Sequence, residues 1–137
     1  ESEFRNKDYL FMKIFNSAKK IKNKEMKLLE LGSTNLVRDW SFAGDIAEAI
    51  FLINQSDNNN NFIIGSGVST SISKIVEKVF SLYDLKPEDY IKVNPKLLRE
   101  GDPLEIVSDP SLLKSELNWS PQLSVDDLLE RIFHKIK

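Results

Sequence analysis

The segment VRDWSFAGDIAEAIFLI, from Val37 to Ile53, places the strongest constraint on how this chain can fold. Its first part follows a turn and carries Arg38 and Asp39 directly before Trp40. Its second part is apolar on most sides and begins at Asp45, which predicts a buried helix with an acid in its first turn. An arginine and a carboxylate therefore lie between a turn and an apolar helix.

Two arginine–carboxylate pairs in the sequence are candidates for a binding site. Arg38 and Asp39 either form a structural ion pair, or Asp39 holds Arg38 so that its planar guanidinium meets a phosphate. Arg99 and Asp102 stand in the loop LLREGDP, where an arginine can contact a phosphate while a carboxylate accepts from both ribose hydroxyls. A solvated turn is the other interpretation of this loop, and both alternatives remain open for each pair.

The composition limits the classes of function. A chain of 137 residues is about one domain, and its 41% hydrophobic and 29% charged residues are typical of a globular protein. The formal net charge of -2 argues against a nucleic-acid-binding protein. The absence of cysteine excludes disulfides, thiolate metal sites and a cysteine nucleophile. With one histidine, His134, and no EF-hand spacing, we expect no metal site.

The sequence contains no pattern for a membrane span or for secretion. No apolar run reaches the roughly 18 residues that a bilayer-spanning helix needs, and no signal peptide opens the chain. We therefore expect a cytoplasmic protein that binds neither membranes nor nucleic acid. Because the chain begins at Glu1 rather than at a methionine, we also expect it to be a fragment of a larger protein.

Apolar periodicity and turn residues predict an α/β fold with about five helices and a few short strands. Asp8 is expected to cap the first helix and Ser71 the third, and Ser124 with Asp127 forms a capping-box pattern before the last. The predicted helices are 9–22, 45–53, 72–83, 110–117 and 125–136, and the predicted strands are 27–31, 62–64 and 90–93.

Gly65, Ser66 and Gly67 follow a predicted strand and precede a helix, where a phosphate-binding loop would lie. The segment lacks the GxGxxG spacing and the Walker lysine. A glycine turn at the end of a strand is the better interpretation.

Four blocks of the sequence resemble the C-terminal part of the GDP-mannose 4,6-dehydratase family, within the extended short-chain dehydrogenase/reductase superfamily. The blocks are ESEFRNKDYLFMKI, LELGSTNLVRDWSFAGDIAEAIFLI, FIIGSGVSTSISKIVEKVF and NPKLLREGDPLEIVSDPSLLKSELNWSPQLSVDDLL. The resemblance covers essentially all of the chain. It implies that residues 1–137 form a C-terminal GDP-sugar-binding domain, a small substrate-binding lobe whose N-terminal Rossmann half is absent.

The resemblance also implies roles for individual residues. Lys13 and Arg38 would contact the phosphates of the GDP-sugar, and Arg99 and Asp102 would hold its nucleoside and ribose. The two guanidinium groups are then expected to converge on one diphosphate pocket. Arg5 would reach the phosphate of NADP, across a subunit boundary in a homo-oligomer. Asp102 departs from the family pattern, which usually has glutamate at that position.

The activity that the resemblance implies is the conversion of GDP-mannose to GDP-4-dehydro-6-deoxy-mannose with NADP, a lyase reaction on the route to GDP-fucose. The family's catalytic residues would all precede Glu1, so no catalytic residue is predicted here. Tyr9 and Lys13 match the Tyr-x-x-x-Lys spacing of such enzymes, and we treat that match as coincidence. Two alternatives remain: part of another NAD(P)-dependent nucleotide-sugar epimerase or reductase, such as the GDP-4-keto-6-deoxymannose reductase, and a non-catalytic interaction module.

Overall fold

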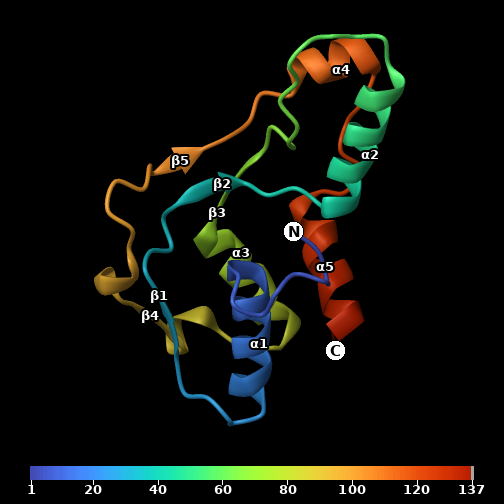
Figure 1. The fold of residues 1–137 in the computed structure, drawn as a ribbon. Coiled ribbons are helices and arrows are strands. Elements are labelled where there is room, and N and C mark those ends of the chain that lie inside the picture. The colour runs from blue at the N-terminus through green and yellow to red at the C-terminus, as the bar shows by residue number, and fades with distance from the viewer. Residues whose placement is uncertain (137) are drawn as a thin grey trace.

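Three amphipathic helices form the main core in the computed structural model, which describes residues 1–136 (Figure 1). These are α1 (Leu10–Lys22), α3 (Ile72–Leu82) and α5 (Val125–Ile136), and each packs one apolar face inward. The largest fully buried side chains of this core come mainly from the three helices: Phe11, Phe15, Phe80, Ile14, Ile75, Val79, Leu128, Leu129 and Ile132. The helices predicted from periodicity are confirmed here.

Of the three N-terminal helix caps predicted from the sequence, two are present in the structure and one is not. The Ser71 hydroxyl accepts from the backbone N–H of Lys74 at 3.2 Å, as predicted. Ser124 and Asp127 exchange side-chain-to-backbone hydrogen bonds of 3.1 and 3.2 Å, which confirms the capping box. The predicted cap at Asp8 is wrong, because α1 has Tyr9 at its N-cap position with no side-chain cap.

Two small sheets border the helices. Strand β1 (Leu29–Leu31) pairs in parallel with β4 (Ile91–Val93), so the predicted strands at 27–31 and 90–93 are confirmed in shortened form. Strand β2 (Val37–Asp39) lies in the middle of the second sheet, antiparallel to β3 (Ser69–Ser71) and parallel to β5 (Glu105–Ile106). This register sets Arg38 opposite Thr70 on one side and Ile106 on the other.

The strand predicted at Phe62–Ile64 is wrong. That segment forms no strand among the described residues, and the antiparallel position on β2 belongs to Ser69–Ser71 instead. The apolar side chains of Phe62 and Ile64 pack against a second, smaller core cluster. Their hydrophobicity therefore reflects side-chain packing rather than membership of a sheet.

The second cluster lies at one end of the molecule, where α2 (Ala43–Gln55) and α4 (Ser111–Leu117) meet (Figure 1). Its buried members are Ala49, Leu113 and Trp119. The prediction that α2 is buried on most sides is wrong, because two of its apolar side chains, Ile50 and Phe51, are 49% and 62% exposed. Within residues 1–136, the α/β class with five α-helices and few short strands is confirmed.

Two 3-10 helices, η1 (Pro87–Asp89) and η2 (Pro95–Leu97), flank β4, and the chain continues from η2 to β5. The longest helices of residues 1–136 have 13 residues, and none combines the length and apolar character needed to cross a bilayer.

Candidate functional site

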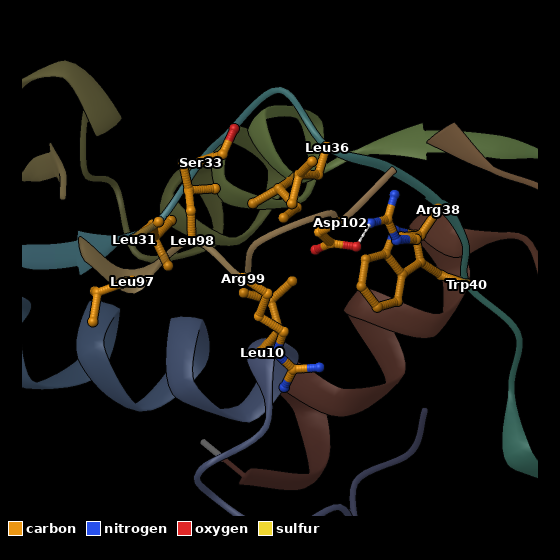
Figure 2. Close-up of a pocket in the computed structure, with 12 residues that line it drawn as sticks. Leu10, Leu31, Ser33, Leu36, Arg38, Trp40, Leu97, Leu98, Arg99 and Asp102 are labelled. Carbon is orange, nitrogen blue, oxygen red and sulfur yellow. Dashed lines mark hydrogen bonds and ion pairs between the residues drawn. The ribbon is translucent and has the colours of Figure 1, made fainter. Parts of the chain in front are cut away.

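A cavity of about 300 Å³ brings Arg38, Arg99 and Asp102 together (Figure 2). Arg38 comes from the central strand β2, and the other two come from the loop that follows η2. The rest of the wall is mostly apolar: Leu10, Leu31, Leu36, Trp40, Ile72, Leu97 and Leu98, with Gly32 and Ser33. A concave, largely apolar wall with a few polar groups is the usual character of a small-molecule site, and this volume lies at the lower end of the range.

Arg38 is paired with Asp102 and not with its neighbour Asp39. Its Nη2 donates to Oδ1 of Asp102 at 2.6 Å, across 64 residues of sequence. Its Nη1 donates to the carbonyl oxygen of Val37 at 2.6 Å and to that of Leu104 at 3.3 Å. The predicted Arg38–Asp39 pair is wrong because consecutive residues of a strand project to opposite faces of the sheet.

Asp39 instead holds the glycine turn. Its Oδ1 accepts from the backbone N–H of Ser66 at 3.0 Å, and its Oδ2 accepts from that of Gly67 at 2.8 Å. The hydroxyls of Ser66 and Ser108 donate to the same carboxylate. The amide donors that a phosphate-binding loop would offer are thus occupied by a carboxylate of the protein. This favours a structural glycine turn over a phosphate-binding loop, but the strand expected before the turn is absent from the described residues.

The electrostatics around Asp39 follow from these contacts. Burial raises the pKa of Asp39, but the hydrogen bonds from Ser108 and Ser66 and from the Gly67 and Ser66 amides outweigh burial and place the pKa below its ordinary value. A Cβ atom on Gly65 would come within 2.8 Å of Asp39 Oδ2 and would overlap the Ser108 hydroxyl. The turn is therefore closely packed around a charged carboxylate.

Arg99 lines the same cavity from the other side of Asp102. Figure 2 shows Arg38 directed toward Asp102, whereas the end of Arg99 extends toward Leu10. The loop is closed by a hydrogen bond from the Asp102 N–H to the Arg99 carbonyl at 3.3 Å. No acidic group within residues 1–136 forms an ion pair with Arg99. The cavity therefore contains two cations and one anion, with one cation unneutralised.

Lys13 lies outside this cavity. Its ammonium donates to the carbonyl oxygen of Glu30 at 3.0 Å, on strand β1. It lines a different depression, whose other lysines are Lys7 and Lys20. Of the four residues expected to contact a GDP-sugar, the structure brings three together and leaves Lys13 apart.

Arg5 also lies elsewhere, before α1. Its guanidinium carbon is 3.8 Å from the ring centroid of Tyr9, its Nε is 3.8 Å from a carboxylate oxygen of Glu1, and its side chain is 45% exposed. With Tyr9 in contact with Arg5 and Lys13 bound to Glu30, the Tyr-x-x-x-Lys spacing does not join the two side chains.

Two hydroxyl groups that shape the site, those of Ser66 and Ser108, could not be assigned from the sequence. Ser66 and Ser108 lie 27 and 69 residues from Asp39, and nothing in their local sequence indicates a common partner. Trp40 is held over the core by Phe11, with ring centroids 5.0 Å apart, and by a 3.2 Å hydrogen bond from its Nε1 to the Thr70 carbonyl. Within residues 1–136 no three histidine or acidic side chains are placed to hold a metal ion.

Comparison with known proteins gives both a sequence and a fold relationship. The family model described as GDP-mannose 4,6 dehydratase matches residues 1–132. A GDP-mannose 4,6 dehydratase of Drosophila melanogaster is 29% identical over 94% of this chain, and the chain spans 37% of that relative's length. The dTDP-glucose 4,6-dehydratase of Bacillus anthracis in complex with NAD superposes with a TM-score of 0.82 at 19% identity, covering 100% of this chain and 42% of that chain.

A second solved structure, RMD from Pseudomonas aeruginosa complexed with NADPH, gives a TM-score of 0.81 at 14% identity over 95% of this chain and 43% of that chain. At these identities the two structures establish the fold alone, and that fold agrees with the expected α/β class. The chain spans well under half the length of the curated relatives it matches.

Proposed function

Because the chain belongs to the GDP-mannose 4,6-dehydratase family, we propose that it is the nucleotide-sugar-binding part of such an enzyme. The observation that carries this proposal is the shared cavity of Arg38 and Arg99. Two guanidinium groups from segments far apart in the sequence offer several planar N–H donors to the oxygens of a diphosphate. Asp102 lies between them and can accept from the two hydroxyls of a ribose.

The rest of the cavity suits a nucleotide. Its apolar wall, which includes Trp40 and Leu98, offers contact area to a base or a sugar ring. In the proposed enzyme, binding energy spent on the nucleotide orients the distant hexose for reaction. This chain then contributes binding and orientation, and its residues take no catalytic role.

The nicotinamide cofactor proposed for the whole enzyme is NADP, and only one contact to it is proposed from this chain. Arg5 rests on Tyr9 and its side chain is 45% exposed, so a phosphate can approach its guanidinium from solvent. When bound, the cofactor would accept and return a hydride. We further propose that the enzyme is cytoplasmic and works as a homo-oligomer in which Arg5 reaches a neighbouring subunit's cofactor.

The proposal predicts that the chain binds GDP and does not turn over GDP-mannose. Titration of residues 1–137 with GDP should show saturable heat and a raised melting temperature. Arg38→Met and Arg99→Met should each weaken binding at least about tenfold, since each removes a charge-assisted contact worth about 1.5–3 kcal/mol. Lys86 is exposed and does not line the cavity, so Lys86→Met is the control for the loss of one positive charge elsewhere on the chain.

Two results would count against the proposal. The first is GDP binding that survives Arg38→Met and Arg99→Met unchanged. The second is no binding at all, which favours the alternative of a non-catalytic interaction module. Product formed from GDP-mannose by this chain with added NADP would contradict the assignment of a purely binding role.

A further inference from the structure

We propose that Asp102 acts as an internal anion that occupies Arg38 until a diphosphate displaces it, so that the cavity favours ribonucleoside diphosphates over inorganic pyrophosphate. This inference rests on the proposed function of the cavity. The inference adds that the Asp102 carboxylate competes with the ligand for Arg38. This competition gives the cavity a basis for distinguishing between diphosphate ligands.

The first argument is the state of Arg38. One terminal nitrogen is committed to two backbone carbonyls, those of Val37 and Leu104, and the other donates to Asp102 at 2.6 Å. Asp102 therefore holds the part of the guanidinium that a phosphate oxygen would use. The two side chains are 17% and 27% exposed, so solvent screens this pair less than a surface ion pair. A phosphate placed on Arg38 would also stand beside the Asp102 carboxylate and be repelled by it.

The second argument is the contrast with Arg99. It is exposed, forms no ion pair with residues 1–136, and lies three positions before Asp102 in the same loop. A diphosphate can therefore contact Arg99 without displacing anything, but it can reach Arg38 only if Asp102 moves away. The hydrogen bond from the Asp102 N–H to the Arg99 carbonyl couples the two positions.

The loop has room for this exchange. Gly101 has φ of 73°, and a Cβ atom placed on it would meet nothing within 4 Å. A released Asp102 carboxylate lacks a cation partner, and hydroxyl donors are a suitable replacement. A ligand with a ribose supplies two such hydroxyls, whereas pyrophosphate supplies none. Asp102 thus weakens the binding of every diphosphate, and only a ligand with a ribose regains affinity through hydrogen bonds to the released carboxylate.

The test compares GDP, 2′,3′-dideoxy-GDP and pyrophosphate by calorimetry on the full chain. Asp102→Asn should bind pyrophosphate at least about fivefold more tightly than wild type, because the variant removes the carboxylate that competes with the ligand for Arg38. The preference of wild type for GDP over the dideoxy nucleotide should largely disappear in this variant. Glu100→Gln removes the same charge from an exposed neighbour and should change pyrophosphate affinity much less.

Arg38→Met combined with Asp102→Asn shows whether the gain passes through Arg38, because the gain should vanish in the double variant. Asp102→Ser serves as a second variant if the asparagine form melts early. The inference is overturned if wild type binds GDP through Arg38 but Asp102→Asn leaves pyrophosphate affinity unchanged or weaker. If no variant and no wild-type sample binds any of the three ligands, the proposed function fails instead.

Discussion

The carboxylate of Asp39 accepts the backbone N–H of Gly67 at 2.8 Å, which ties the end of strand β2 to the glycine turn. Its sequence neighbour Arg38 projects to the other face and is held by Asp102. The two carboxylates thus hold two different structures, one a backbone turn and the other a side chain of the cavity. Asp39 and Arg38, the two residues through which these structures are attached, both belong to the three-residue central strand β2.

Replacing Asp39 with asparagine should destabilise the chain. Each carboxylate oxygen accepts one backbone N–H, from Ser66 and from Gly67, and an asparagine amide keeps only one acceptor oxygen. One backbone donor is then left facing an NH₂ group, and hydrogen bonds to charged groups contribute about 1.5–3 kcal/mol each. We expect Asp39→Asn to lower the free energy of unfolding by about 2 kcal/mol, as measured by urea denaturation. Asp57→Asn, in an exposed loop, should change it little.

The contribution of Asp39 should also depend on pH with a defined sign. Hydrogen bonding lowers the pKa of Asp39 in the folded chain below the value of about 3.9 expected when unfolded. The stabilisation is therefore fully present above that value and is lost as pH falls through the lower, folded pKa. The difference in urea midpoint between wild type and Asp39→Asn should be constant from about pH 7 to pH 5 and shrink below about pH 4. A difference that grows on acidification would contradict this assignment.

The close packing of the turn predicts a coupling between Gly65 and Ser108. An alanine at position 65 would press its Cβ onto the Ser108 hydroxyl and approach Asp39, so Gly65→Ala should cost about 1–3 kcal/mol of stability. Removing the hydroxyl with Ser108→Ala relieves part of that overlap. We expect the double variant to be at least about 0.5 kcal/mol more stable than the two single effects would give if they were additive. Strict additivity would show that the two positions do not meet.

Features that depend on neighbouring residues in the chain were predictable from sequence. The inner face of α3 follows from the spacing of its apolar residues, and its start follows from Ser71 as a local acceptor. The same holds for the capping box of Ser124 and Asp127. These interactions span three or four residues, so both partners of each one lie within the same short segment of the sequence.

Features that depend on distant partners were not predictable in this way. Strand β3 consists of Ser69, Thr70 and Ser71, a polar triplet without apolar alternation, and only its pairing with β2 makes it a strand. The partner of Arg38 is 64 residues away, while an acceptable but wrong partner stands next to it. The family resemblance grouped Lys13, Arg38, Arg99 and Asp102 in one expected site. The structure brings the last three to one cavity and leaves Lys13 apart, bound to the Glu30 carbonyl.

Asp45 provides a last prediction, on how the small cluster is attached to the main core. It lies in the first turn of α2, is 4% exposed, and accepts the backbone N–H groups of Gln122 at 3.0 Å and Leu123 at 3.2 Å. Asp45→Ala leaves both donors unpaired in a partly buried place, so stability should fall by about 2–3 kcal/mol.

The loss of stability in Asp45→Ala should affect the segment around Gln122 and Leu123 more than the main core. Amide hydrogen exchange at Gln122 and Leu123 should accelerate more than exchange in the middle of α3, whose buried side chains belong to the main core. Asp126→Ala is the matched control, because Asp126 is also a first-turn acid, of α5, but is exposed. Equal acceleration in α3 and at Gln122 would mean that Asp45 stabilises the whole chain and not the junction between its two clusters.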